Sequence, residues 1–177
     1  NLPQKTESDS WNYTRIDFNG KMAGNVSQRS TTFDDRVQIT YGGVKRPLDT
    51  IDRDKLPPGA GSMRSNSLKL IQHDIEGQKK KSISMLAKGN AEVEGNTLIK
   101  SKQTPTSQEF SASADTISFD ESKDQYMLRS FGNRKATLRR FSHSGQNPQR
   151  VVSQQIDFSP SHDRVTLHGV TELQGLP

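Results

Sequence analysis

The chain has 177 residues, no cysteine and a formal net charge of +5, and hydrophobic residues make up 29% of it. The absence of cysteine excludes disulfides and thiol chemistry, and no apolar run is long enough for a transmembrane helix. The mean hydropathy of −0.87 indicates few large apolar residues, so the hydrophobic core is expected to be thin. This argues against an enzyme scaffold with helices on both faces of a sheet and favours strands with one solvated face.

Residues 1–10 are polar and are expected to form a flexible tail before a single domain that spans residues 11–177. Alternation of apolar and polar residues begins at Ile16 and Phe18 and returns from Val37 to Tyr41, which is the period of a strand with one buried face. Residues 44–62 interrupt this alternation and contain three prolines. We expect a long surface loop there.

The alternation resumes after the loop and continues to the end of the chain. Turn-forming pairs such as Gly42-Gly43, Gly89-Asn90, Gly95-Asn96 and Gly132-Asn133 interrupt it, and no segment shows the spacing of an amphipathic helix. The sequence therefore predicts an all-β, antiparallel fold of the sandwich, barrel or jellyroll type. The alternating positions are Leu68, Leu70, Ile83, Met85, Ala91, Val93, Ile117, Phe119, Tyr126, Leu128, Ala136, Leu138, Ile156, Phe158, Val165 and Leu167.

An internal repeat is the strongest signal in the chain. Residues 117–128 align without a gap with residues 156–167, and both copies read apolar-x-Phe, four turn residues, Asp and a second apolar alternation. Each copy predicts a hairpin, and stacked hairpins would share their dry faces. Glycines such as Gly89 and Gly169 follow return strands of this kind, and we expect them to let the strand bend or bulge.

Six segments, in this order, carry motifs of a known family: residues 16–25, 37–43, 86–93, 110–119, 130–138 and 153–173. They resemble strands of the OstA/LptA family of periplasmic lipopolysaccharide-transport proteins. The resemblance implies a β-jellyroll of two sheets opened into a V, with acyl chains held between the sheets. Two features depart from the family pattern: the 44–62 insertion, and Phe119 and Phe158 where the family usually has tyrosine.

The resemblance implies a non-enzymatic domain of the periplasm, alone or within a longer membrane-anchored protein. Its partners would be lipopolysaccharide or a similar acylated lipid, and other OstA-like domains, including copies of itself, joined through edge strands. No cofactor or metal is expected, since the four histidines lack metal-ligand spacing. The candidate lipid-binding residues are Ile16, Phe18, Val37, Ile39, Leu68, Leu70, Ile117, Phe119, Leu128, Ile156, Phe158, Val165 and Leu167.

Basic residues are candidates for contact with lipid phosphates, which cations bind through charge-assisted hydrogen bonds. These candidates are Lys79, Lys80, Lys81, Arg134 and Arg139. An ordinary solvated surface explains the same residues. Nucleic acid is not expected as a partner, because the aromatic residues do not interleave with the basic clusters as stacking platforms do.

A closed core is the alternative to a lipid groove. The same apolar residues would then fill a sealed sandwich, since protein interiors are normally close-packed. An OstA-like scaffold of this kind would mediate only protein–protein assembly, by pairing its exposed edge strands with strands of a partner.

Overall fold

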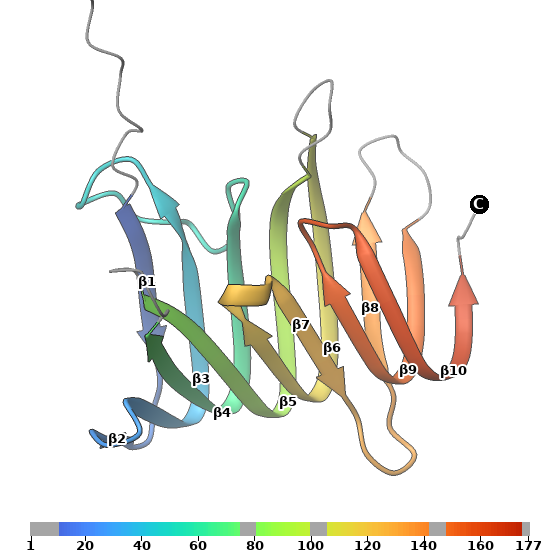
Figure 1. Cartoon of the computed structure of the whole chain (residues 1–177), viewed down its shortest axis with the longest axis horizontal. Helices are drawn as coiled ribbons and strands as arrows, with labels where there is room; N and C mark the ends of the chain where they lie inside the picture. The colour runs from blue at the N-terminus through green and yellow to red at the C-terminus, as the bar shows by residue number, and fades with distance from the viewer. Residues whose placement is uncertain (1–10, 75–80, 100–105, 142–147, 175–177) are drawn as a thin grey trace, which may run out of the picture.

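The computed structural model describes residues 11–74, 81–99, 106–141 and 148–174, so the predicted tail over residues 1–10 lies outside the described part. Within these ranges the chain forms ten strands and one short 3₁₀ turn, which confirms the all-β prediction (Figure 1). The strands are β1 (Trp11–Asp17), β2 (Met22–Asn25), β3 (Ser30–Val44), β4 (Ala60–Asp74), β5 (Lys81–Ile99), β6 (Thr106–Asp120), β7 (Gln125–Arg129), β8 (Ala136–Phe141), β9 (Gln149–Ser159) and β10 (Arg164–Gln174), with η1 at Glu121–Lys123.

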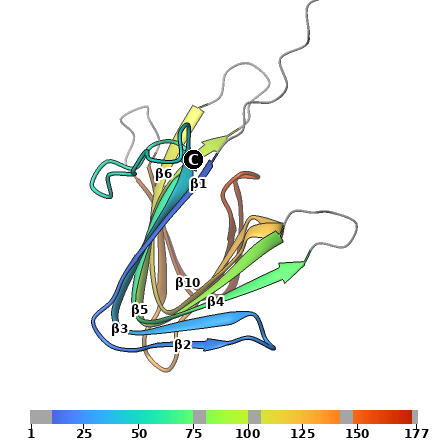
Figure 2. The same cartoon turned by 90° about the vertical axis from the view of Figure 1, so that its left-hand side faces the viewer.

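All ten strands belong to one antiparallel sheet in the order β1-β3-β4-β5-β6-β7-β9-β10, with β2 beside β3 and β8 between β6 and β9. The sheet folds over on itself along a crease, and its two arms form a V (Figure 2). Half-sheet I contains residues 11–17, 37–44, 60–65, 91–99, 106–114, 136–141, 149–153 and 172–174. Half-sheet II contains residues 22–25, 30–34, 67–74, 81–88, 116–120, 125–129, 155–159 and 164–168.

The crease is built from irregularities in the long strands. Pairing shifts between Asp34 and Val37, between Arg64 and Ser67, and between Lys88 and Ala91. Extra residues of this kind bend a strand. Gly89 and Gly169 lie at such bends with φ of 78° and 70°, as the sequence predicted.

Some of the predicted turns are wrong. Gly42-Gly43 lies within β3, and Gly89-Asn90 and Gly95-Asn96 lie within β5. Here glycine serves a bulge or a close contact between strands, so the strands are longer than the sequence signals indicated. Gly132-Asn133 does form a turn, between β7 and β8.

The internal repeat corresponds to two adjacent hairpins of half-sheet II, β6–β7 and β9–β10. Asp124 and Asp163 end the two turns in the left-handed conformation, with φ of 45° and 51°. Their N–H groups donate to the carbonyls of Glu121 and Pro160. Equivalent repeat positions share a row across the four strands, as Ile117, Leu128, Ile156 and Leu167 do, and as Phe119, Tyr126, Phe158 and Val165 do.

The predicted loop over 44–62 corresponds to the β3–β4 connection, residues 45–59, because Val44 and Ala60–Ser62 belong to the strands. The loop lies against the outer face of half-sheet I. Ile51 is buried beside Gly42 and Ala60, and Arg53 Nη1 donates to Gln38 Oε1 at 2.7 Å. These contacts hold the middle of the loop on the outer face, away from the space between the half-sheets.

Candidate functional site

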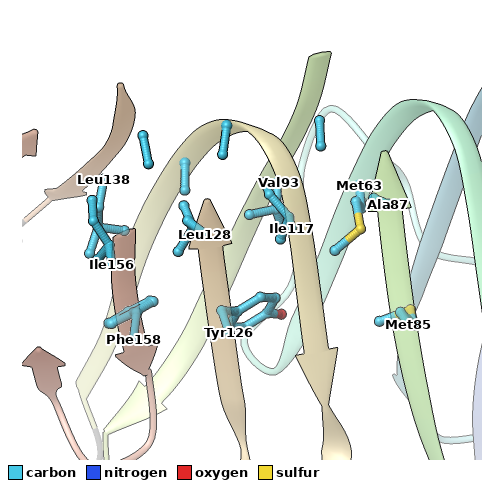
Figure 3. Packing of buried hydrophobic residues seen from close by; sticks show 14 of the residues in the cluster. Met63, Met85, Ala87, Val93, Ile117, Tyr126, Leu128, Leu138, Ile156 and Phe158 are labelled. Carbon is cyan, nitrogen blue, oxygen red and sulfur yellow. The ribbon is translucent and has the colours of Figure 1, made fainter. Parts of the chain in front are cut away.

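The inner faces of the V carry one apolar residue from each strand in turn. In half-sheet I this row is Ile16, Ile39, Met63, Val93, Ala112, Leu138, Val151 and Leu173. In half-sheet II it is Met22, Phe33, Leu68, Ala87, Ile117, Leu128, Ile156 and Leu167. The middle of both rows packs into a common core (Figure 3). The interior is thus a continuous apolar core that runs from one edge of the sheet to the other, and it is called the trough below.

An aromatic cluster joins the two half-sheets above these rows. Phe110 of half-sheet I meets Phe158 and Tyr126 of half-sheet II, with ring centroids 5.0 and 5.5 Å apart. Tyr41 stacks on Phe119 at 6.3 Å, and its hydroxyl is hydrogen-bonded to the Tyr126 hydroxyl. These five residues, named the aromatic clasp below, close the V over its deep interior.

Burial keeps the two phenols of the clasp neutral. Desolvation raises the pKa of Tyr41 to about 12 and raises the pKa of Tyr126 well above its usual value. A phenolate would be costly in this apolar surrounding. The hydrogen bond that ties the half-sheets together therefore persists through the physiological pH range.

Two glycines allow the rings of the clasp to lie close to the sheet. A Cβ added at Gly61 would be 2.6 Å from Tyr41 Oη, and one added at Gly95 would be 2.4 Å from Phe110 Cε1. Each glycine stands directly across the ladder from the aromatic residue it accommodates. Each ring therefore covers the bare backbone of the neighbouring strand.

A pocket of about 260 Å³ opens the trough to solvent near β1, and we call it the mouth pocket. Glu121 and residues 12–14 belong to its lining. Ile83, which is 39% exposed, also lies there, so an apolar surface is accessible from outside. The apolar and aromatic side chains of the lining are Tyr13, Ile39, Tyr41, Leu70, Ile83, Met85 and Phe119.

All thirteen candidate lipid-binding residues belong to the core cluster or pack against it. Three of them, Ile39, Leu70 and Phe119, line the mouth pocket. Their contact with lipid stays a prediction. Seven are buried, namely Val37, Ile39, Leu68, Ile117, Leu128, Ile156 and Phe158, and six are partly buried, namely Ile16, Phe18, Leu70, Phe119, Val165 and Leu167.

The candidate phosphate-binding cations that the structure describes do not lie together. Lys79 and Lys80 lie outside the described residues, and Lys81 is exposed at the start of β5. Arg134 lies at the crease, where it forms an ion pair of 3.0 Å with Asp115. Arg139 is exposed and alternates with the inward-facing Leu138, so it lies on the outer face of half-sheet I. Phosphate binding by these residues remains a prediction.

One inward-facing cation was missed by the sequence analysis. Arg140 follows Ala136 and Leu138 at spacings of two, so the alternation that marks those two as buried also turns Arg140 inward. Its side chain is 13% exposed and forms an ion pair with Asp163 of the β9–β10 turn. The period-two pattern of residues 136–140 places residue 140 on the inner face, so the sequence does carry a signal for this cation.

Apolar side chains make up the core cluster of the described residues. Among the described residues, no cluster of three or more His, Cys, Asp or Glu side chains is placed to hold a metal ion. No helix in the described ranges is long and apolar enough to cross a membrane. The side chains of the core cluster are apolar, so the main chemical capacity of the interior is the burial of hydrocarbon.

No protein-family model matches the sequence, and no curated protein matches it. Among solved structures, the chain is similar to LptH of Pseudomonas aeruginosa, described as the LptA-homologous periplasmic component of the conserved lipopolysaccharide transport device. The two share 13% sequence identity and a TM-score of 0.58, over 97% of this chain and 94% of that one. Likeness at this identity concerns the fold, and it confirms the architecture that the motif resemblance implied: this chain has the LptA-like β-jellyroll fold.

Proposed function

We propose that this protein is a periplasmic carrier domain that holds the acyl chains of lipopolysaccharide, or of a similar envelope lipid, between its half-sheets. The likeness in fold to a lipopolysaccharide-transport component supports the proposal. The observation that carries it is the apolar trough with its solvent-open mouth pocket. Each methylene that leaves water for such a surface contributes roughly 0.8 kcal/mol.

The aromatic clasp closes the deep interior, so in this closed arrangement the mouth pocket is where an acyl chain first meets inward-facing apolar surface. An acyl chain that begins at Ile83 and Leu70 meets Tyr41 and Phe119 next. A short chain fits the mouth pocket as it stands. A longer chain advances along the trough only when the Tyr41–Tyr126 contact opens and the half-sheets part.

A bridging role in assembly accompanies the carrier role in this proposal. In the described part of the chain, β1 pairs with β3 and β10 pairs with β9, and each leaves its other side free. Free edges of this kind accept strands from a partner. End-to-end pairing of similar domains would extend the trough from one domain to the next. A scaffold that uses these edges without any lipid is the competing function.

A substitution in the mouth pocket tests the carrier role. Ile83→Glu places a carboxylate on the lining, and we expect it to weaken binding of a fluorescent fatty acid about tenfold or more, because burying a charge beside hydrocarbon is costly. Ser84→Glu adds the same charge to the next residue, which faces the other side of β5. It should bind the probe like the wild type.

Native mass spectrometry of protein extracted from envelope fractions supplies an independent readout. The carrier role predicts co-purifying acylated lipid that the Ile83→Glu protein lacks. Wild-type protein that carries no lipid and does not bind the fatty acid would leave the scaffold as the function.

A further inference from the structure

Arg140 occupies a position in the trough that otherwise belongs to apolar side chains. It stands directly across the ladder from Phe110 of the aromatic clasp and two residues beyond the fully buried Leu138. With 13% exposure, its side chain has lost most of its contact with water. An arginine placed there is costly unless its guanidinium is well paired.

The pairing of this guanidinium is incomplete. Nη2 interacts with the Asp163 carboxylate and donates to Gln108 Oε1 at 3.4 Å. Nε is buried and has no hydrogen-bond partner. A guanidinium presents its donors as a planar fork that matches the oxygens of a phosphate or carboxylate. One edge of the fork thus lacks an acceptor, and because Nε is buried, an anionic oxygen reaches it only when the contacts around Arg140 open.

The present partner of Arg140 can leave. Asp163 lies in the β9–β10 turn at the end of half-sheet II, and its side chain is 48% exposed. The ion pair therefore spans the rim of the V, from β8 to the opposite arm. Once Asp163 swings into water, the guanidinium is exposed beside an aromatic, apolar interior.

We propose that Arg140 binds the phosphate headgroup of an amphiphile whose acyl chain lies in the trough, and that this phosphate takes the place of Asp163. This inference rests on the proposed carrier function and assigns it a ligand class: amphiphiles with a phosphate monoester or a similar oxyanion at the head. The headgroup breaks the Arg140–Asp163 contact at the rim, and the acyl chain enters beside Phe110 as the half-sheets part.

Two amphiphiles that differ only in their headgroup separate the contribution of the phosphate to binding from that of the acyl chain. Binding of dodecyl phosphate, dodecanol and inorganic phosphate is measured by calorimetry for the wild type, Arg140→Gln and Arg129→Gln. Arg129 is an exposed arginine on the outer face of β7, so its loss changes the net charge equally without touching the trough. The wild type should prefer dodecyl phosphate to dodecanol by roughly tenfold or more, the range of a hydrogen bond to a charged group.

Arg140→Gln should abolish this preference and keep the affinity for dodecanol, whereas Arg129→Gln should keep both. Equal binding of the two amphiphiles by the wild type overturns the role of Arg140 but leaves the carrier function in place. Failure of the wild type to bind either amphiphile refutes the carrier function itself. Inorganic phosphate that binds as tightly as dodecyl phosphate would show a plain anion site and overturn the lipid assignment.

A second variant keeps the test open should Arg140→Gln fail to fold. Asp163→Asn removes the competing carboxylate and leaves Arg140 in place, so dodecyl phosphate should bind several-fold more tightly and dodecanol unchanged. Unaltered or weaker binding of dodecyl phosphate would contradict the exchange of Asp163 for a phosphate.

Discussion

On the inner face of half-sheet I, glycines on one strand make room for aromatic rings on the next. Gly61 lies beneath Tyr41 and Gly95 beneath Phe110, and both rings belong to the aromatic clasp. The cost of glycine in a strand is offset here, because each ring covers the backbone that the missing side chain would leave bare. The contact between half-sheets therefore depends on two residues that have no side chain.

Substitution of Gly95 tests this dependence. In Gly95→Ala the new methyl would come within 2.4 Å of Phe110 Cε1, and the ring has Tyr126 and Phe158 against it. We expect a loss of about 1–3 kcal/mol in the free energy of unfolding, as for other overpacked sites. Urea denaturation measures it. Gly24→Ala, where a Cβ meets nothing within 4 Å, is the matched control, and an equal loss there would refute the argument.

Individual inward-facing residues were largely predictable from period two. The pattern identified Ile117, Leu128 and Ile156 as core residues, and all three are fully buried. It could not show which residues meet across the V, since those contacts depend on how the sheet folds at the crease. The hydrogen bond between the Tyr41 and Tyr126 hydroxyls joins residues 85 positions apart, and no local sequence signal indicates it.

At the scale of whole strands, the decisive feature is the bulge that carries each long strand from one half-sheet into the other. The sequence marked Gly89-Asn90 as a turn because both residues tolerate positive φ. They do adopt it, at 78° and 47°, but β5 continues beyond them into half-sheet I. A turn and a bulge draw on the same residue types, so sequence signals alone do not distinguish a strand that ends from a strand that bends.

The bulge of β5 makes Gly89 sensitive to substitution. Gly89→Ala puts a side chain at φ +78° and a Cβ 2.6 Å from Asn66 Nδ2, so both the backbone and the packing oppose it. The expected cost is about 1–2 kcal/mol in unfolding free energy. Gly43→Ala lies within β3 with no neighbour within 4 Å and should cost far less. Equal melting temperatures for the two variants would show that the crease needs no glycine there.

For the molecule as a whole, the order of motifs was more informative than any one of them. In the structure, the strands of the two repeat copies pair in a register that places Phe119, Tyr126 and Phe158 in one row across the sheet. No single motif predicts this register. The sequence identity to LptH is only 13%, so little else in the sequence indicates the shared architecture. The gap between the half-sheets was not predictable, because it depends on how far large side chains such as Phe110 reach across the V.

The two arms are held together by a contact that alkali should weaken. An unfolded tyrosine ionises near pH 10, whereas burial raises the pKa of Tyr41 to about 12 and that of Tyr126 well above its usual value. Between pH 10 and 12 the unfolded chain has released a proton that the folded chain retains, so the free energy of unfolding falls as pH rises. Below pH 10 this contribution is fully present.

The double variant Tyr41→Phe/Tyr126→Phe keeps both rings and removes both ionisable hydroxyls. We expect its unfolding free energy, from urea titrations at half-unit steps between pH 9 and 12, to decline less steeply than that of the wild type. Ionisation of the lysines is common to both proteins and cancels in the comparison. In the wild type the loss should coincide with binding of a hydrophobic dye, because phenolates repel each other across the clasp and the trough becomes accessible. Parallel pH profiles for the two proteins would show that the hydroxyl pair does not hold the half-sheets closed.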